Sequence, residues 1–461
     1  MENSTSSNFT SARPCRFTHD ALAHILTREL ALSAEVPLYI AFSGGLDSHV
    51  LLHALAALRT QAPWQITALH IDHGLQPDSA AWARHCAAVC AALGVAYRSE
   101  RVVVNGIAEF GLEDAARRAR YAVLARLLPA GAVLLAAHHQ DDQAETVLLQ
   151  LLRGAGVPGL AGMPAITPFA RGRLARPLLG FKRAELAAYA AANGLHWIDD
   201  ASNADTRRSR NFLRQRLLPV LTGHWPEAAA SIARVARHQA EAGTLLQELA
   251  RIDLAHAQNS EGELVVSAVA SLSPERQANL LRYWIRTQDV SAPSDTVLRQ
   301  ILARLRQQPL TRHAVVRWRD GEVRRYRDRL AFFIGAAATP PAWEAVWTPT
   351  TVLEIPGASL CLRALPAIGA GLSRARLEGK ELHVRLRRGG ERCRVRGHQH
   401  KVKKLLQEAG VPPWERAQLP LIYVDDALVA IGDRWICEPY GAQADEPGLL
   451  LVLEKNDARP S

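Results

Sequence analysis

The chain has 461 residues, of which 48% are hydrophobic and 22% charged, so two or three domains with buried cores are expected. No apolar run is long enough to cross a bilayer, and the polar opening, residues 1–15, lacks the apolar centre of a secretion signal. Six scattered cysteines without a CxxC pair favour a reducing, cytoplasmic setting over a disulfide framework or a cysteine metal site.

The formal net charge is +10 and the sequence pI is about 9.6. An excess of basic residues suits a polyanionic partner such as nucleic acid. An arginine-rich composition inherited from a GC-rich genome would give the same number. The charge therefore leaves both interpretations open until its location along the chain is considered.

Short apolar runs alternate with longer segments of helical spacing in the first 140 residues. The runs typical of buried strands are Pro37–Phe42, Ile66–His70, Arg101–Val104 and Val133–Ala137, and the intervening helical segments are Ser48–Leu58, Ser79–Leu93 and Glu113–Leu128. This alternation predicts an α/β domain with a doubly wound parallel sheet. Ligands of such a sheet bind beyond the carboxyl ends of its strands.

The pattern changes after residue 226. Ala228–Leu254, Pro274–Arg286 and Ser294–Gln307 have helical spacing, Val315–Ile334 reads as strands around a turn, and Ala336–Trp343 is a linker candidate because it clusters small residues and prolines. We therefore predict a leader with a first helix (1–34), the α/β domain (35–225), a mainly helical middle domain (226–335), a linker (336–350) and a small α+β C-terminal domain (351–461).

The stretch SGGLDS, Ser43–Ser48, lies where the first strand should turn into a helix. Such a turn presents unpaired backbone N–H groups, which suit a phosphate, and Gly44 and Gly45 allow a close approach. The hydroxyls of Ser43 and Ser48 add donors. The loop lacks the lysine of GxxxxGK[ST], and its Asp47 would repel a polyphosphate unless a hard cation such as Mg²⁺ lay between them. SGG alone is better explained as a capped helix start.

The whole hexapeptide is more specific, and it resembles the PP-loop of the N-type ATP pyrophosphatases, which cleave ATP between the α and β phosphates. Further motifs resemble one family of that group, the tRNA(Ile)-lysidine synthetases. They are HIDHGL (70–75), GLEDAARRARY (111–121), AHHQDDQAETVLLQLLRGAG (137–156), RPLL (176–179), WIDDASNADTRRSRNFLR (197–214), GGERCR, KVKKLLQEAGVPPWERAQLPLIYVDD and GDRWI. One position departs from the family pattern, since Ala201 stands where proline is common.

The resemblance implies a ligase that uses ATP, Mg²⁺, free L-lysine and the isoleucine tRNA with a CAU anticodon. The C2 oxygen of the wobble cytidine would attack the α-phosphate and release pyrophosphate. The side-chain amine of lysine would then displace AMP, giving lysidine. The modified tRNA would pair with AUA instead of AUG and be charged with isoleucine instead of methionine. The oligomeric state stays open, a homodimer included.

The resemblance also implies site residues. ATP would lie against Ser43, Gly44, Gly45, Leu46, Asp47, Ser48, His70, Asp72, His73 and His138, with Mg²⁺ on Asp47. Lysine would bind Asp142 and Glu145, which are i, i+3 at a helix start and face one side. Catalysis would involve Asp47, Asp142, Glu145 and Arg214. The tRNA would contact Glu113, Arg117, Arg120, Tyr121, Arg210, Asn211, Arg392, Arg394, Arg396, Lys403, Lys404, Trp414 and Arg416.

Several of these residues have plainer explanations. Acids in a first helical turn are favoured by the helix dipole, and Glu113 and Arg117 have the spacing of a surface ion pair. A histidine at a strand end is commonly structural. The stretch 385–404 stands apart, because its many Arg and Lys side chains face Glu391 as their sole acidic neighbour in sequence. The charge excess is thus concentrated, which favours a polyanion there.

Two other functions fit part of the sequence. A tRNA 2-thiocytidine synthetase is another PP-loop enzyme that acts on cytidine, but it uses CxxC cysteines around an iron–sulfur cluster. A non-enzymatic RNA-binding protein would need neither an intact SGGLDS nor an intact DDQAET. Release of AMP and pyrophosphate that depends on both tRNA and lysine separates the three.

Overall fold

The computed structural model describes residues 17–74, 78–199, 205–288, 290–306, 314–334, 343–356 and 360–455. The chain divides into two compact units, Met1–Leu245 and Leu246–Ser461. None of the helices in the described ranges has the length and apolar character needed to cross a membrane. Residues 1–16 of the predicted leader and residues 336–342 of the linker candidate lie outside those ranges.

The N-terminal unit is built on a six-stranded sheet of order β3-β2-β1-β4-β6-β5. Its strands are β1 (Leu38–Ala41), β2 (Ile66–Asp72), β3 (Ala96–Arg101), β4 (Val133–Leu135), β5 (Ile166–Phe169) and β6 (Gly172–Ala175). All neighbours pair in parallel except β5, which is antiparallel to β6. The chain order reverses at β1, so the carboxyl ends of β1 and β4 flank the topological switch point.

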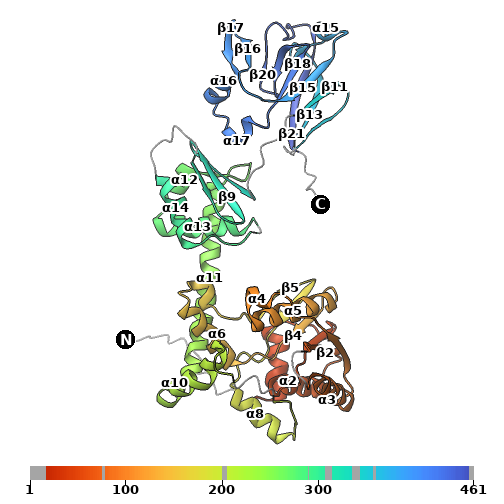
Figure 1. Cartoon of the computed structure of the whole chain (residues 1–461), viewed down its shortest axis with the longest axis vertical. Helices are drawn as coiled ribbons and strands as arrows, with labels where there is room; N and C mark the ends of the chain where they lie inside the picture. Colours follow the sequence, from red (N-terminus) through yellow and green to blue (C-terminus); the bar gives the residue numbers. More distant parts are fainter. Residues whose placement is uncertain are drawn as a thin grey trace, which may run out of the picture. The chain divides into compact units, whose positions relative to one another are not determined.

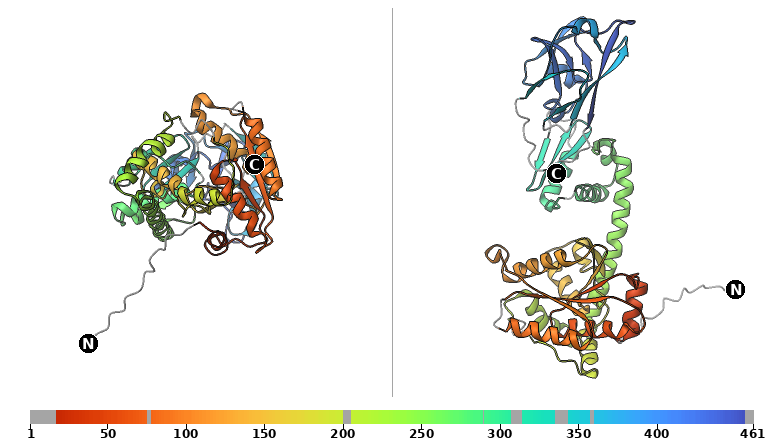
Figure 2. Two further views of the ribbon diagram at one scale, coloured as in Figure 1. Left: turned by 90° about the horizontal axis from the view of Figure 1, so that it is seen from below. Right: turned by 90° about the vertical axis from the view of Figure 1, so that its right-hand side faces the viewer.

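Helices cover both faces of this sheet (Figure 1 and the right-hand view of Figure 2). Leu38 and Ile40 of β1 pack among residues of α2 and α8, whereas Tyr39 and Ala41 pack among residues of α5. This is the predicted doubly wound α/β fold. The helical segments are α1 (His19–His24), η1 (Ile25–Glu29), α2 (Leu46–Leu58), α3 (Ser79–Ala92), α4 (Ile107–Phe110), α5 (Leu112–Leu127), α6 (Gln140–Leu152), α7 (Val157–Leu160), α8 (Arg183–Ala192), α9 (Ser209–Phe212), η3 (Leu213–Leu217) and α10 (Leu218–His224), with η1 and η3 π-helical.

One predicted strand is wrong. Residues 101–104 read as a strand, but β3 occupies Ala96–Arg101 and shares only Arg101 with that range. β3 is the edge strand next to β2, and most of its side chains are exposed or half-buried. An edge strand of this kind carries no run of apolar residues, so the apolar valines that follow it give the stronger signal.

Helix α11 (Ala228–Ala257) continues across the boundary between the two units. The middle of the chain then forms an antiparallel sheet of order β7-β10-β9-β8 that shares a core with the neighbouring helices around Trp284. The predicted middle domain thus holds a larger sheet than the strand pair expected there. Its elements are β7 (Leu264–Val265), α12 (Val266–Ala270), α13 (Pro274–Arg286), α14 (Asp295–Arg306), β8 (Ala314–Arg317), β9 (Gly321–Tyr326) and β10 (Arg329–Ile334).

The C-terminal part is made of two antiparallel sheets, β11-β15-β18-β19-β20 and β12-β13-β21-β14, with a separate hairpin of β16 and β17. Strand β11 falls inside the predicted linker but pairs with β15, so it belongs to this fold. The elements are β11 (Glu344–Trp347), β12 (Leu353–Ile355), β13 (Leu360–Ile368), β14 (Leu372–Ser373), α15 (Arg374–Leu377), β15 (Leu382–Leu386), β16 (Arg392–Val395), β17 (His398–Lys401), α16 (Val402–Glu408), α17 (Pro413–Arg416), β18 (Pro420–Val424), β19 (Ala427–Ile431), β20 (Trp435–Ile436) and β21 (Pro447–Lys455).

Candidate active site

The SGGLDS segment forms the turn between β1 and α2. Gly44 has a φ of +81°, and a Cβ there would lie 2.7 Å from Ile198 Cδ1 and 2.8 Å from Cys86 Sγ. Both the backbone angle and the space therefore require glycine at this position. The N–H of Ile198 also donates to the Gly44 carbonyl at 2.9 Å. Ile198 and Cys86 thus lie against the loop at Gly44, and helix α2 begins directly after the loop.

The two serines of the loop bind mainly to the loop itself. The hydroxyl of Ser48 donates to the Gly45 carbonyl (3.1 Å) and accepts the N–H of Ser43 (3.3 Å), and the two serine oxygens lie 3.1 Å apart. Ser48 is buried and its hydroxyl shapes the turn, and its assignment to ATP stays a prediction. The side chain of Leu46 lies in the hydrophobic core, which leaves its backbone to face a ligand.

Acidic side chains from β4–α6 converge beside this loop. Asp142 accepts the backbone N–H of His139 at 3.1 Å, a capping contact that fixes the first turn of α6. As predicted from their i, i+3 spacing, Asp142 and Glu145 face the same way, and a single guanidinium joins them. Arg214 donates to Glu145 through Nε (2.6 Å) and Nη2 (3.0 Å), and to Asp142 Oδ1 through Nη2 (2.8 Å).

His139 lies at the centre of the acids and is 1% exposed. Its Nε2 is 3.6 Å from Asp47 Oδ2 and 3.4 Å from Asp142 Oδ2, and its Nδ1 is 3.5 Å from Asp141 Oδ2. Burial alone would lower the pKa of His139, but its bonds to Asp141 and Asp47 and the charge of Asp142 raise it to about 10. The sequence names His138 and His139 together as possible contacts of the nucleotide or the base, and it assigns His138 to ATP.

In the ion pair of Glu145 and Arg214, the carboxylate is the fully buried partner. Glu145 is 0% exposed, and burial raises its pKa although Arg214 opposes that shift. Burial disfavours the charge of Arg214 as well, yet its contacts with Glu145 and Asp142 raise the pKa of Arg214 overall. Two short, charge-assisted bonds in a bidentate arrangement favour the ionised pair at neutral pH.

The pKa of His139 gives a testable pH dependence. Because its folded pKa, about 10, lies above the ordinary value of 6.5, the charge stabilises the folded state fully below pH 6.5, and this contribution is lost as the pH rises through 10. We expect the free energy of unfolding to fall more steeply between pH 6.5 and 10 in the wild-type protein than in His139→Asn. Urea unfolding at several pH values measures this, and parallel curves for the two proteins would contradict it.

The cluster leaves one acid uncompensated. The carboxylates Asp47, Asp141, Asp142 and Glu145 face the cations His139, Arg210 and Arg214, four against three, at separations of 3.6 Å or less. Asp47 Oδ1 is moreover buried, and no described residue makes a hydrogen bond to it. A buried carboxylate oxygen of this kind needs a donor or a cation, so the arrangement suits one further positive charge.

The histidines and acid predicted to touch ATP have mixed roles. His70, at the end of β2, is buried, and its Nδ1 lies 2.9 Å from the carbonyl of Phe42, so it joins β2 to β1. Asp72 accepts the N–H of Gly74 at 2.8 Å and closes a turn. Burial lowers the pKa of His73 and also that of His138, the latter to about 3. Both are therefore neutral at pH 7.

Helix α5 brings basic and aromatic groups to the same edge of the sheet. Arg117 lies over the ring of Tyr121 at 5.0 Å, and its charge also acts on His138. Arg120 lies 5.9 Å from the same ring and acts on His73. Glu113 falls in α5, but its side chain is outside the described part of the chain. The sequence motif RPLL adds Arg176, which is buried and binds the Pro164 carbonyl.

Helix α9 supplies the remaining predicted residues of this unit. Arg210 Nη2 donates to Thr146 Oγ1 at 2.9 Å, and its Nε is 3.6 Å from Glu145 Oε2, so Arg210 belongs to the acidic cluster. Asn211 is buried and donates to the Asp205 carbonyl at 3.0 Å. Its contact positions the segment that leads into α9.

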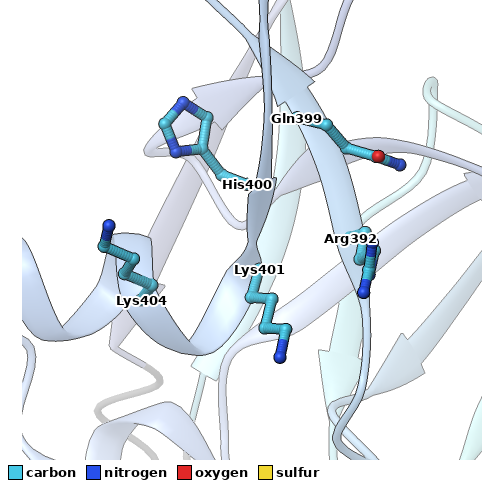
Figure 3. Close-up of a pocket in the computed structure, with 5 residues that line it drawn as sticks. All are labelled: Arg392, Gln399, His400, Lys401 and Lys404. Carbon is cyan, nitrogen blue, oxygen red and sulfur yellow. The ribbon is translucent and has the colours of Figure 1, made fainter.

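The predicted basic residues of the C-terminal part gather on the β16–β17 hairpin and α16. A cavity of about 390 Å³ is lined by Arg392, Gln399, His400, Lys401 and Lys404 (Figure 3). Arg394 and Arg396 are on the same hairpin, and Lys403 is on α16, but none of the three lines the cavity. The sequence motif selects Arg392 and Lys404 but misses Gln399 and His400 of β17, whose pairing with β16 brings them alongside.

Trp414 and Arg416 lie elsewhere. The Trp414 ring packs against Tyr326 and Phe333, with ring centres 6.3 and 5.8 Å apart. Arg416 is 9% exposed, and its guanidinium donates to the Val411 carbonyl and to the Tyr326 hydroxyl, both at 2.7 Å. Two residues assigned to tRNA from their motif are thus occupied by contacts inside the protein.

A glycine loop at the switch point of a doubly wound sheet, with acids converging beside it, defines the class of PP-loop ATP-using domains. Residues 19–221 match the family model described as a PP-loop domain. Residues 264–331 match the TilS substrate binding domain, and residues 382–453 match the TilS substrate C-terminal domain.

The chain is similar over most of its length to curated tRNA(Ile)-lysidine synthases. It is 44% identical to that of Alkalilimnicola ehrlichii over 438 residues, which cover 94% of this chain and 96% of that protein. The protein of Coxiella burnetii is 40% identical (95% and 97% covered), and that of Methylococcus capsulatus is 41% identical (89% and 95%). The chain belongs to the tRNA(Ile)-lysidine synthase family.

Proposed function

We propose that the crevice beyond β1 and β4 binds ATP and joins L-lysine to C2 of the wobble cytidine of the CAU-anticodon isoleucine tRNA, through an adenylated cytidine. As a member of its family the chain is a tRNA-modifying, ATP-using ligase, and lysidine changes the codon read from AUG to AUA and the charging from methionine to isoleucine. The carrying observation is the convergence of Asp47, His139, Asp142 and Glu145 beside the glycine loop.

ATP would lie over the loop amides at the N-terminus of α2, where unpaired N–H groups and the helix dipole favour phosphate. Mg²⁺ would be held by Asp47, whose buried Oδ1 has no hydrogen-bond partner in the part of the chain that the structure describes. Within the described ranges no group of three or more His, Cys, Asp and Glu side chains could hold a metal by itself, so phosphate oxygens and water would supply the other ligands. The ion would neutralise charge on the departing pyrophosphate.

The lysine amine would approach Asp142 and Glu145, whereas the uncompensated charge of the cluster lies on Asp47 and would face Mg²⁺. Arg214 already bridges Asp142 and Glu145, so an incoming ammonium group would share these carboxylates with it. Once the amine has lost its proton it can attack C2 of the adenylated cytidine and release AMP. Glu145, which is fully buried, would act chiefly by holding Arg214 in place, and Asp142, which is slightly exposed, would be the nearer contact.

The cytidine would approach from the side of α5. Arg117 and Arg120 carry charge for its phosphates, and Tyr121 offers an aromatic ring between them. His138 stays neutral because of its burial, so it can take part in a hydrogen bond to a base without repelling the nearby arginines.

The basic hairpin would bind tRNA phosphates. We expect the triple substitution of Arg392, Lys401 and Lys404 by Ala to weaken tRNA binding and to reduce the salt dependence of log K by about 0.7 to 0.9 for each phosphate that the variant no longer neutralises. Binding isotherms at several salt concentrations measure this slope. Replacing Arg363, Arg374 and Lys380 by Ala removes the same charge from exposed positions of the same fold and is the control. Equal slopes in the two triple variants would place the RNA elsewhere.

The reaction itself is tested by incubating the protein with ATP, Mg²⁺, lysine and a tRNA transcript and analysing the wobble nucleoside by mass spectrometry. Lysidine should form, and omission of lysine should leave adenylated tRNA. An unmodified cytidine under all conditions would overturn the proposal. A homodimer is a separate prediction, which light scattering tests. A cytoplasmic setting agrees with the five described cysteines, all buried free thiols.

A further inference from the structure

The motif VPPWER, Val411–Arg416, has no role in the proposed function. It contains α17, and it follows α16, which carries Lys404 of the basic cavity. Its side chains meet the β9–β10 hairpin of the middle sheet, within the same compact unit. The contact therefore joins the sheet of the middle segment to the fold that bears the basic hairpin.

The aromatic part of this contact is built around Trp414. Its ring meets Tyr326 at 83° and Phe333 at 72°, the edge-to-face arrangement that aromatic pairs prefer. Arg416 completes the cluster from the same turn, because its guanidinium lies 5.3 Å from the Tyr326 ring centre and donates to the Tyr326 hydroxyl. Burial of Arg416 makes these bonds costly to break.

Charged contacts flank the aromatic cluster. Arg329 Nη2 donates to Glu415 Oε1 at 2.7 Å, and its Nε binds Glu263, so one guanidinium ties β10 to α17. Arg327 Nη2 donates to the Gln407 carbonyl at the end of α16 at 2.6 Å. Gly410 has a φ of +73°, and a Cβ there would lie 2.9 Å from Arg327 Nη1, so glycine lets this arginine approach.

The Arg327 contact lies about one helical turn from the basic cavity, since Gln407 follows Lys404 by three residues on α16. We propose that Trp414, Glu415 and Arg416 are positioning residues: they lock the basic hairpin to the middle sheet, so that both meet the tRNA as one preorganised body. The proposal deepens the proposed function and rests on it. Two surfaces in a fixed relative orientation bind tRNA more tightly than the same surfaces joined by a flexible linker, because less orientational entropy is lost on binding.

The alternative is that Trp414 stacks directly on a tRNA base, and a double-mutant cycle separates the two. Phe333→Ala removes the partner of Trp414 from the middle sheet and leaves Trp414 intact. Under the proposal, Trp414→Ala and Phe333→Ala each raise the Kd for tRNA roughly tenfold, and the double variant is no worse than either. The value of kcat at saturating tRNA should stay within about twofold, and Trp414→Phe should largely restore affinity. Additive effects, or an unaffected Phe333→Ala, would overturn the proposal.

Whether the α17 contact fixes the orientation of the two folds can be tested without tRNA. Spin labels at Arg299→Cys and Glu378→Cys, both exposed, report the distance between the two folds after Cys15 is replaced by Ser. We expect one narrow distance distribution, which Trp414→Ala and Arg329→Met broaden. Arg319→Met removes the same charge from a 95% exposed position and should leave it narrow. A distribution that stays narrow in Trp414→Ala would overturn the proposal. Failure of the wild-type protein to bind tRNA would instead overturn the proposed function and, with it, the role of this contact in tRNA binding, whatever the distance distribution shows.

Discussion

Replacement of Asp47 by Asn should reduce tRNA-dependent release of AMP and pyrophosphate by about 100-fold or more. Asp47 lies at the start of α2, where its Oδ1 is buried with no partner among the described residues and its Oδ2 faces His139. The substitution keeps the shape but removes the charge that would hold Mg²⁺ against the polyphosphate. Affinity for tRNA should stay within about twofold, because the proposed phosphate contacts lie on other residues.

The control for this variant is Asp20→Asn, which removes a carboxylate from an exposed position on α1. It should release AMP at the wild-type rate. A wild-type rate of AMP release in Asp47→Asn would rule out the proposed metal role.

Replacement of Glu145 by Gln, or of Asp142 by Asn, should block transfer of lysine more than formation of the adenylate. Both carboxylates bind Arg214, and Glu145 is fully buried. Removing one charge leaves Arg214 and the lysine amine without the field that orients them. We expect ligation to fall by about 100-fold, adenylated tRNA to accumulate and the apparent KM for lysine to rise. Quenched time courses analysed by mass spectrometry separate the two steps.

Glu322 offers a matched control, because it is 1% exposed and pairs with Arg317 and Arg324 in the middle sheet. Glu322→Gln breaks a buried ion pair of the same kind and should lower stability without any accumulation of adenylated tRNA. If Glu145→Gln slows both steps equally, or leaves the KM for lysine unchanged, the assignment of the acids to lysine is wrong.

Much of the fold could be predicted from local sequence because its central strands are buried on both faces. β1, β2 and β4 appear as apolar runs, and α2, α3 and α5 lie at nearly the predicted residues. The edge strand β3 could not be found this way, since its exposed side chains resemble those of a loop. The antiparallel sheet of the middle domain was underestimated because pairing of the very short β7 depends on contacts distant in sequence.

The sequence predicts the acidic residues of the candidate site, but it does not predict the cationic side chains that pair with them. The spacing of Asp142 and Glu145 places both side chains on one face of α6. Their ion pairs with Arg214 of η3 depend instead on how helices far apart in the sequence pack together. Hydrogen bonds that the sequence does not reveal also matter. The Ser48 hydroxyl donates to a carbonyl of its own loop, and the buried Arg416 donates to the Tyr326 hydroxyl. A motif thus identifies residues that matter, but it does not separate those that touch a ligand from those that hold the fold.

The central claim is that the loop between β1 and α2 holds the phosphates of ATP. A crystal structure with Mg²⁺ and an ATP analogue carrying a methylene group between the α and β phosphates tests it directly. We expect β- and γ-phosphate oxygens within hydrogen-bond distance of the backbone N–H groups of residues 44–48, with the ion against Asp47. A triphosphate bound at any other place, with this loop empty, would contradict it.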